Sequence, residues 1–189
     1  DTITYKNKKE VIYMPKIIIL TGAGISVESG LETFQDNPTI RQKLDREYAN
    51  ENWDEYSTWY KDWSENIMKA EPNKYHYLIS DLKHTYKNKL LVATTNIDRL
   101  HMKTGFGETI YELHGSVCFF YSSVDDITLY GDLPNEEYFD FCNAVYKALC
   151  WNKKEEVYFI SIGSSKETST IASFLQDCMF LERNCYNFD

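Results

Sequence analysis

Glycines and polar side chains gather in four short segments, and each segment directly follows an apolar run. The segments are Gly22-Ala23-Gly24, Asn96 to His101, His114-Gly115-Ser116 and Gly163-Ser164-Ser165. Glycine lets a ligand or another segment approach the backbone, and backbone N–H groups can bind phosphate without net positive charge. Together the segments predict a site for a large, polar, phosphate-bearing ligand. Taken alone, the first segment is a weak signal, because a lone Gly-x-Gly is more often a tight turn from a strand into a helix.

Alternating strand and helix patterns predict the framework that positions these segments. Apolar runs indicate strands at 16–21, 89–95, 109–113, 127–130, 156–163 and 185–188. Helical patterns occupy 39–70, 74–84, 134–150 and 171–179, and a further helix is expected to open at 25–29. The alternation is typical of an α/β fold with a doubly wound, mostly parallel sheet. Ligands bind such sheets at the carboxyl ends of the strands, so we expect the four segments to be neighbours.

Composition and charge narrow the class of protein. The 189 residues are 43% apolar, which suffices for a sizeable core, and we expect a single globular domain over 1–189. The formal charge of −9 argues against a partner that is a nucleic acid. Apolar runs fall short of the roughly 20 residues that span a membrane. Five cysteines with no C-x-x-C pair and no signal peptide predict reduced thiols and a cytoplasmic location.

Six segments, taken in order along the chain, resemble the motifs of the sirtuins, the NAD-dependent protein lysine deacylases. They are GAGISVESGLETF from Gly22, EPNKYHYLISDL from Glu71, TTNIDRLHMKTG from Thr94, YELHGSV from Tyr111, LYGDLP from Leu129 and FISIGSS from Phe159. The resemblance covers roughly residues 16 to 166. It implies a Rossmann-like domain with a helical insertion at about 36–72, and NAD as the cofactor.

The resemblance also implies roles for individual residues. Sirtuins cleave the nicotinamide–ribose bond of NAD and transfer the acyl group of an acyl-lysine to ADP-ribose. His114 is then the general base, an imidazole being suited to this by its pKa, and Asn96 and Asp98 hold the ribose and the carboxamide. The residues expected to bind NAD are Gly22, Ala23, Gly24, Ser26, Phe34, Gln35, Thr95, Asn96, Ile97, Asp98, Gly163, Ser164 and Ser165. Those expected to bind the acyl-peptide are Gly131, Asp132 and Leu133.

The chain departs from the family pattern within two of these motifs. Gln35 stands where the family has an arginine, and an amide is not an equivalent partner for a diphosphate. Thr95 replaces a glutamine, and Arg99 replaces a glycine. The glycines at 22 and 24 are retained, and we expect them to let the NAD pyrophosphate approach the backbone.

Two further departures concern the acyl substrate. Most sirtuins insert a zinc ribbon near 117–127, where this chain has a short segment with Cys118 alone. We therefore expect a short replacement of that module, such as a hairpin, and no zinc. Tyr60 aligns with the tyrosine of a Tyr-x-x-Arg pair that binds acidic acyl groups in one branch of the family, but Trp63 replaces the arginine. This predicts little preference for succinyl groups.

Three functions remain open from the sequence. A deacylase acting on an acyl-lysine protein or peptide is favoured, because His114, Asn96 and Asp98 are all present. An NAD hydrolase or ADP-ribosyltransferase would use the same bond cleavage, and loss of the zinc module would favour it. A non-catalytic NAD or ADP-ribose sensor is the third, with Gln35 and Thr95 marking decayed chemistry. The sequence does not specify an oligomeric state.

Overall fold

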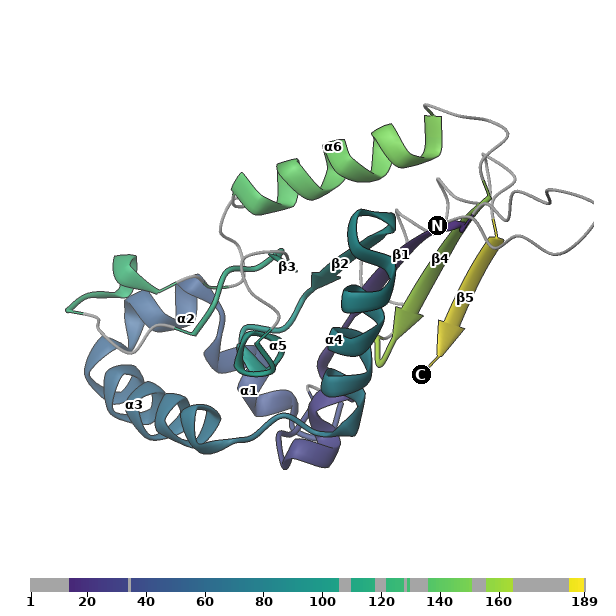
Figure 1. Cartoon of the computed structure of the whole chain (residues 1–189). Coiled ribbons are helices and arrows are strands. Elements are labelled where there is room, and N and C mark those ends of the chain that lie inside the picture. Colours follow the sequence, from purple (N-terminus) through teal and green to yellow (C-terminus); the bar gives the residue numbers. More distant parts are fainter. Residues whose placement is uncertain are drawn as a thin grey trace, which may run out of the picture.

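A parallel sheet forms the centre of the computed structural model, which describes residues 14–33, 35–105, 110–117, 122–127, 129, 136–150, 156–164 and 184–188. The strands are β1 (Lys16–Thr21), β2 (Leu90–Thr94), β3 (Ile110–Glu112), β4 (Val157–Ile162) and β5 (Asn184–Phe188), in the order β3-β2-β1-β4-β5 (Figure 1). Every neighbouring pair is parallel. This order confirms the predicted Rossmann-like fold. The strand order reverses between β1 and β4, where such sheets bind ligands.

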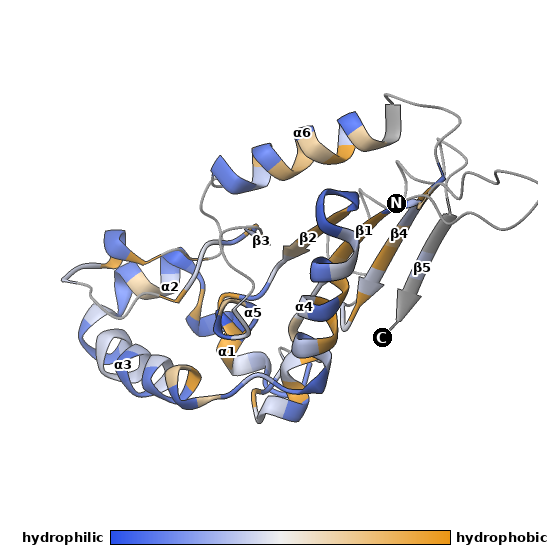
Figure 2. Ribbon diagram, viewed as in Figure 1, coloured by the Kyte–Doolittle hydropathy of each residue, from blue (hydrophilic) through white to orange (hydrophobic). Residues whose placement is uncertain are grey.

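Apolar residues on both faces of β1 explain why it is the central strand. Successive strand residues point to opposite faces. Ile18 and Leu20 pack in one core cluster with residues of α6 (Glu136–Cys150), whereas Ile19 packs in another with Ile79 of α4 (Lys74–Tyr86). The sheet therefore lies between two helical layers, and Figure 2 shows the hydrophobic strands β1 and β2 beside the more polar helices.

The predicted helical region at 39–70 forms three helices with a core of their own. They are α1 (Pro38–Lys43), α2 (Arg46–Glu51) and α3 (Trp53–Lys69). Asp45 begins α2, because its carboxylate accepts hydrogen bonds from the backbone N–H groups of Glu47 and Tyr48. Tyr56 and Tyr60 of α3 are fully buried in this core.

The segment 122–127 packs against these helices, where the sequence predicts a replacement of the zinc module. The Arg46 guanidinium donates to the carbonyl oxygens of Val124 and Ile127 at 2.7 and 2.8 Å. Ile127 and Leu129 join the helical core and lie outside any strand, so the strand predicted at 127–130 is wrong for these two residues. The short 3₁₀ helix η3 (Val124–Asp126) precedes them, capped by Ser123 and Asp126.

Three short elements complete the described chain. The segment predicted to open a helix at 25–29 lies in a 3₁₀ helix, η1 (Ala23–Ser29), and η2 (Lys87–Lys89) and α5 (Leu100–Lys103) flank β2. The helix predicted at 171–179 lies outside the described residues. Among the described helices, none is both long and apolar enough to cross a membrane. The cytoplasmic location stays a prediction.

Candidate active site

The loops after β1 and β4 are in direct backbone contact. The N–H of Gly22 donates to the carbonyl of Ile162 at 3.0 Å, and that of Gly24 donates to the carbonyl of Gly163 at 2.8 Å. A Cβ placed on Gly24 would lie 2.7 Å from the Cα of Gly163, which is closer than real contacts allow. The glycines are therefore required by the contact between the two loops. Their predicted contact with a pyrophosphate stays a prediction, and these two N–H groups are already used by the fold.

A buried network of polar side chains joins the loop after β1 to the loop after β2. Ser26 Oγ donates to Asp98 Oδ2 at 2.7 Å. The Asn96 amide nitrogen donates to the Gly22 carbonyl at 3.1 Å and to Ser26 Oγ at 3.2 Å. Ser26, Asn96 and Asp98 are 2%, 8% and 8% exposed. The two residues predicted to hold the ribose and the carboxamide, Asn96 and Asp98, are thus fixed beside the first glycine loop.

His114 lies on the third loop, which packs against the second. The backbone N–H of Val117 donates to the carbonyl of Ile97 at 2.8 Å, and that of Leu113 donates to the carbonyl of Thr94 at 2.9 Å. Because β2 and β3 are adjacent, these bonds bring the His114 loop to the same edge of the sheet as Asn96. His114 is half-buried, and this burial lowers the pKa of its imidazole. The neutral ring can accept a proton near neutral pH.

Two buried histidines and an asparagine make contacts next to this edge of the sheet. None of the three was among the predicted site residues. His101 Nε2 lies 3.0 Å from Thr21 Oγ1, and its ring packs edge-on against His76 at 4.8 Å between centroids. Asn73 caps α4 together with His76, and its amide donates to the carbonyl of Ile25 at 2.7 Å. The polar residues of the EPNKYHY segment were the available signal for this network. Burial, and secondarily the charge of His76, lower the pKa of His101 to about 3.

The remaining predicted residues differ in how the structure places them. Thr95 donates from its N–H to the carbonyl of Thr21 at 2.9 Å, and Ile97 packs toward the helical core. Gln35 is exposed in a turn, Ala23 is half-buried at the start of η1, and Ser164 is buried beside Gly22. Phe34, Ser165, Gly131, Asp132 and Leu133 lie outside the described residues.

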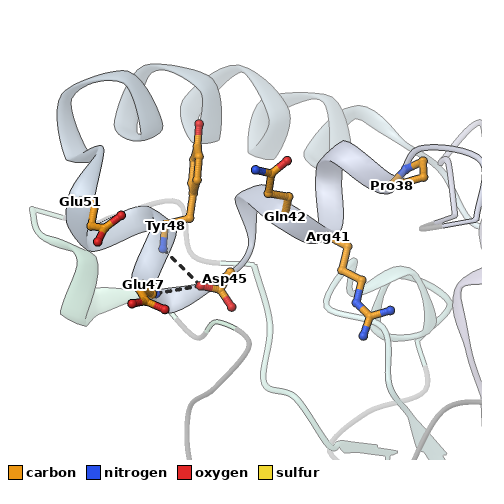
Figure 3. Close-up of a pocket in the computed structure, with 7 residues that line it drawn as sticks. All are labelled: Pro38, Arg41, Gln42, Asp45, Glu47, Tyr48 and Glu51. Carbon is orange, nitrogen blue, oxygen red and sulfur yellow. Dashed lines mark hydrogen bonds between the residues drawn. The ribbon is translucent and has the colours of Figure 1, made fainter.

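A surface hollow of about 510 Å³ lies elsewhere, on α1 and α2. Figure 3 shows its polar lining, with Asp45 bonded to the backbone of Glu47 and Tyr48 and with Arg41 pointing away from them. Its lining residues are Pro38, Arg41, Gln42, Asp45, Glu47, Tyr48 and Glu51. None of the predicted site residues is among them, so the hollow is separate from the strand ends.

The spare acceptor positions of the buried Asp98 fit the amide and hydroxyl donors at the nicotinamide–ribose end of NAD. Asp98 already accepts from Ser26 at Oδ2 and from the N–H of Leu100 at Oδ1. A carboxylate has about four acceptor positions, so each oxygen can still accept one hydrogen bond from an amide or hydroxyl. No group of three or more His, Cys, Asp or Glu side chains suited to a metal ion occurs in the described part of the chain. The expectation of no zinc stays a prediction, because Cys118 is outside that part.

A model of the Sir2 family matches residues 22–124, a span that includes the loops after β1, β2 and β3. The chain belongs to the Sir2 family. Curated relatives include NAD-dependent protein deacylase 1 of Caldanaerobacter subterraneus subsp. tengcongensis, 37% identical over 106 residues that cover 53% of this chain and 43% of the relative. The NAD-dependent protein deacylase of Deinococcus radiodurans is 33% identical over 112 residues, covering 54% and 46%. The matched part of the chain thus corresponds to less than half of each of these relatives.

Longer but weaker similarity extends beyond the family match. The NAD-dependent protein deacylase of Pasteurella multocida is 25% identical over 200 residues, which cover 87% of this chain and 81% of the relative. A solved structure from work on the structural basis of sirtuin substrate affinity has a TM-score of 0.67 at 22% identity, covering 91% of this chain and 81% of the other. This structural likeness supports the Sir2-type fold.

Proposed function

We propose that this Sir2-family chain is an NAD-dependent protein lysine deacylase that acts on acyl-lysine in proteins or peptides. The observation that carries the proposal is the meeting of three loops at one edge of the sheet. Ser26, Asn96 and Asp98 form one buried hydrogen-bonded group, and the His114 loop is tied to it through Val117 and Ile97. The Sir2 family model matches residues 22–124, which include these loops, and relatives named as deacylases match about half of the chain.

The surroundings of each side chain indicate its role in the proposed reaction. His114 is the general base, because burial keeps its imidazole neutral and able to take a proton from a hydroxyl. Asn96 and Asp98 orient the polar groups of the ligand, and Ser26 fixes both of them. NAD, when bound, supplies the ribose carbon that becomes reactive as nicotinamide leaves.

Nicotinamide release from NAD, measured with and without an acetyl-lysine peptide, tests this proposal. We expect release to need the peptide and to fall by about 10²–10⁴ in His114→Ala, the usual contribution of a general base. His84→Ala is the matched control, because His84 is exposed near the end of α4. The control should release nicotinamide at the wild-type rate.

Other outcomes of the same assay would replace the proposal. Release without peptide that is lost in His114→Ala would show an NAD hydrolase. No release, with NAD still bound in calorimetry, would show a sensor. Release that is equal in wild type and His114→Ala would overturn the role of His114.

The acyl preference is a second part of the proposal. Tyr60 is 1% exposed, and its ring lies 5.7 Å from that of Trp63, between centroids. Tyr60 is therefore committed to the core of the helical insertion, and Trp63 offers no cation to a succinyl carboxylate. We expect acetyl-lysine peptides to be turned over faster than succinyl-lysine peptides. Faster removal of succinyl in a competition assay would contradict this.

A further inference from the structure

An ion pair connects the two loops that carry the proposed catalytic residues. Arg99 directly follows Asp98 on the loop after β2, and Glu112 is the last residue of β3, two residues before His114. Arg99 Nε lies 3.8 Å from Glu112 Oε1. The Arg99 side chain is 46% exposed and that of Glu112 only 13%. The arginine thus reaches from one loop to a mostly buried carboxylate at the base of the other.

The backbone at Arg99 is unusual for an arginine. Its φ is 60° and its ψ is 17°, in the left-handed region that favours glycine. Lys87 is the other residue besides glycine with positive φ in the described part of the chain. A glycine would take this conformation without strain. Arginine at this position carries a backbone cost that glycine would not, and what it adds is its side chain. That side chain forms the ion pair with Glu112.

Glu112 lies among other acidic groups. Its backbone N–H donates to Glu137 Oε2 of α6 at 2.6 Å, so the Glu137 carboxylate is also close. Burial raises the pKa of Glu112, the charge of Arg99 opposes this rise, and the charges of Glu137 and Asp98 add to it, so that the pKa of Glu112 is about 7. Arg99 is a cation that favours the ionised form of the Glu112 carboxylate at this site.

We propose that Arg99 and Glu112 are positioning residues, which hold the loop of Asn96 and Asp98 in register with the loop of His114. The Val117–Ile97 hydrogen bond, at 2.8 Å, joins the same two loops and reports on their contact. The catalytic consequence rests on the proposed function, whereas the structural consequence does not. The ion pair itself needs Glu112 ionised, so this local contact weakens as the pH falls through about 7, although burial of the same carboxylate makes the fold as a whole more stable when Glu112 is protonated.

Hydrogen exchange of the Val117 amide, measured by NMR as a protection factor, tests the structural part. The variants are Arg99→Gln, Glu112→Gln and the double variant. Glutamine, like arginine, has a Cβ, so the backbone strain of the left-handed conformation at position 99 stays the same and only the charge is removed. We expect each single variant to lower the protection of Val117 by about two- to five-fold, as a partly exposed ion pair allows. The double variant should lose no more than either single one, because both remove the same contact.

A control variant and a pH series test whether the loss of Val117 protection comes from the Arg99–Glu112 ion pair. Glu55→Gln breaks the ion pair of Lys43 with Glu55, 3.7 Å apart in the helical insertion, and should leave Val117 unchanged. In wild type the protection of Val117 should fall between pH 8 and pH 6, and this fall should disappear in Glu112→Gln. Unchanged protection in both single variants, or losses that add in the double variant, would overturn the proposal.

Nicotinamide release separates this inference from the proposed function. We expect Glu112→Gln to lower kcat several-fold with little change in the KM for NAD, and to remove a pH dependence near 7. If the wild-type protein releases no nicotinamide, the proposed function is wrong, but the hydrogen-exchange result still tests the structural role of the ion pair. If the wild type is active but neither substitution changes the Val117 protection or the pH profile, the inference is wrong and the proposed function still stands.

Discussion

The Ser26 hydroxyl donates to Asp98 Oδ2 across 2.7 Å and so joins the loops after β1 and β2. Both residues are buried, and Ser26 Oγ also accepts from Asn96. Ser26→Ala would leave a buried carboxylate and a buried amide each short of one partner. We expect it to lower the free energy of unfolding by about 1–3 kcal/mol and to weaken NAD binding.

Urea unfolding and calorimetry measure the two effects of Ser26→Ala. Thr58→Ala is the control, because the exposed Thr58 hydroxyl bonds only to the backbone carbonyl of Asp54 within α3 in the described structure. The control should change stability by less than about 0.5 kcal/mol and leave NAD binding unchanged. Equal stability of Ser26→Ala and wild type would show that Asp98 does not depend on this bond.

The close approach of Gly163 to Gly24 predicts a contrast between two glycine substitutions. Gly163 and Gly30 both have positive φ, at 63° and 83°. A Cβ on Gly163 would lie 2.7 Å from the carbonyl carbon of Gly24, whereas a Cβ on Gly30 would meet nothing within 4 Å. Gly163→Ala should therefore cost about 1–3 kcal/mol more than Gly30→Ala in urea unfolding. Similar costs would mean that the loops can separate without loss.

Burial of His101 predicts that the stability depends on pH. The pKa of His101 is lowered to about 3, and in the unfolded chain it returns to about 6.5. Between these values the unfolded state binds more protons, so this contribution is complete above pH 6.5 and is lost as the pH falls. The loss is about 1.4 kcal/mol for each pH unit inside the window.

His101→Gln isolates that contribution, since the amide can still bond to Thr21 but does not titrate. The difference in the free energy of unfolding between wild type and His101→Gln should shrink as the pH falls from 7 to 4. Glu112 acts in the opposite sense: its raised pKa makes the fold lose stability as the pH rises from 4.5 to about 7. Comparing the two proteins at each pH cancels this term. A difference that is constant with pH would contradict the prediction.

The left-handed backbone at Arg99 predicts an inverted preference between glycine and alanine. Both Arg99→Gly and Arg99→Ala remove the guanidinium, but only glycine relieves the conformation at φ 60°. We expect the glycine variant to be more stable by about 0.5–1 kcal/mol in urea unfolding. At Lys61, exposed within α3, alanine should be the more stable by about 1 kcal/mol. The same order at both positions would show that Arg99 is not held in this conformation.

Local patterns in the sequence determined the elements of the sheet. The apolar runs that became β1, β2 and β4 differ from the predicted ranges by one residue at most at either end, because strands of a covered parallel sheet form mostly apolar runs that polar loop residues end. The ordered motifs also indicated the family. Local patterns were insufficient at 127–130, where Ile127 and Leu129 are apolar because they pack into the helical core.

The contacts within the site depended on tertiary structure. The sequence placed glycines at 22, 24 and 163, but it could not show that they face one another, since nearly 140 residues separate the two loops. The ion pair of Arg99 with Glu112 likewise depends on β2 and β3 being adjacent and on a left-handed turn at Arg99. A sequence records residue types and spacing, whereas burial and approach arise only when distant segments pack together. The sequence by itself therefore determined which residues could do the chemistry, and the tertiary structure decided which of them touch.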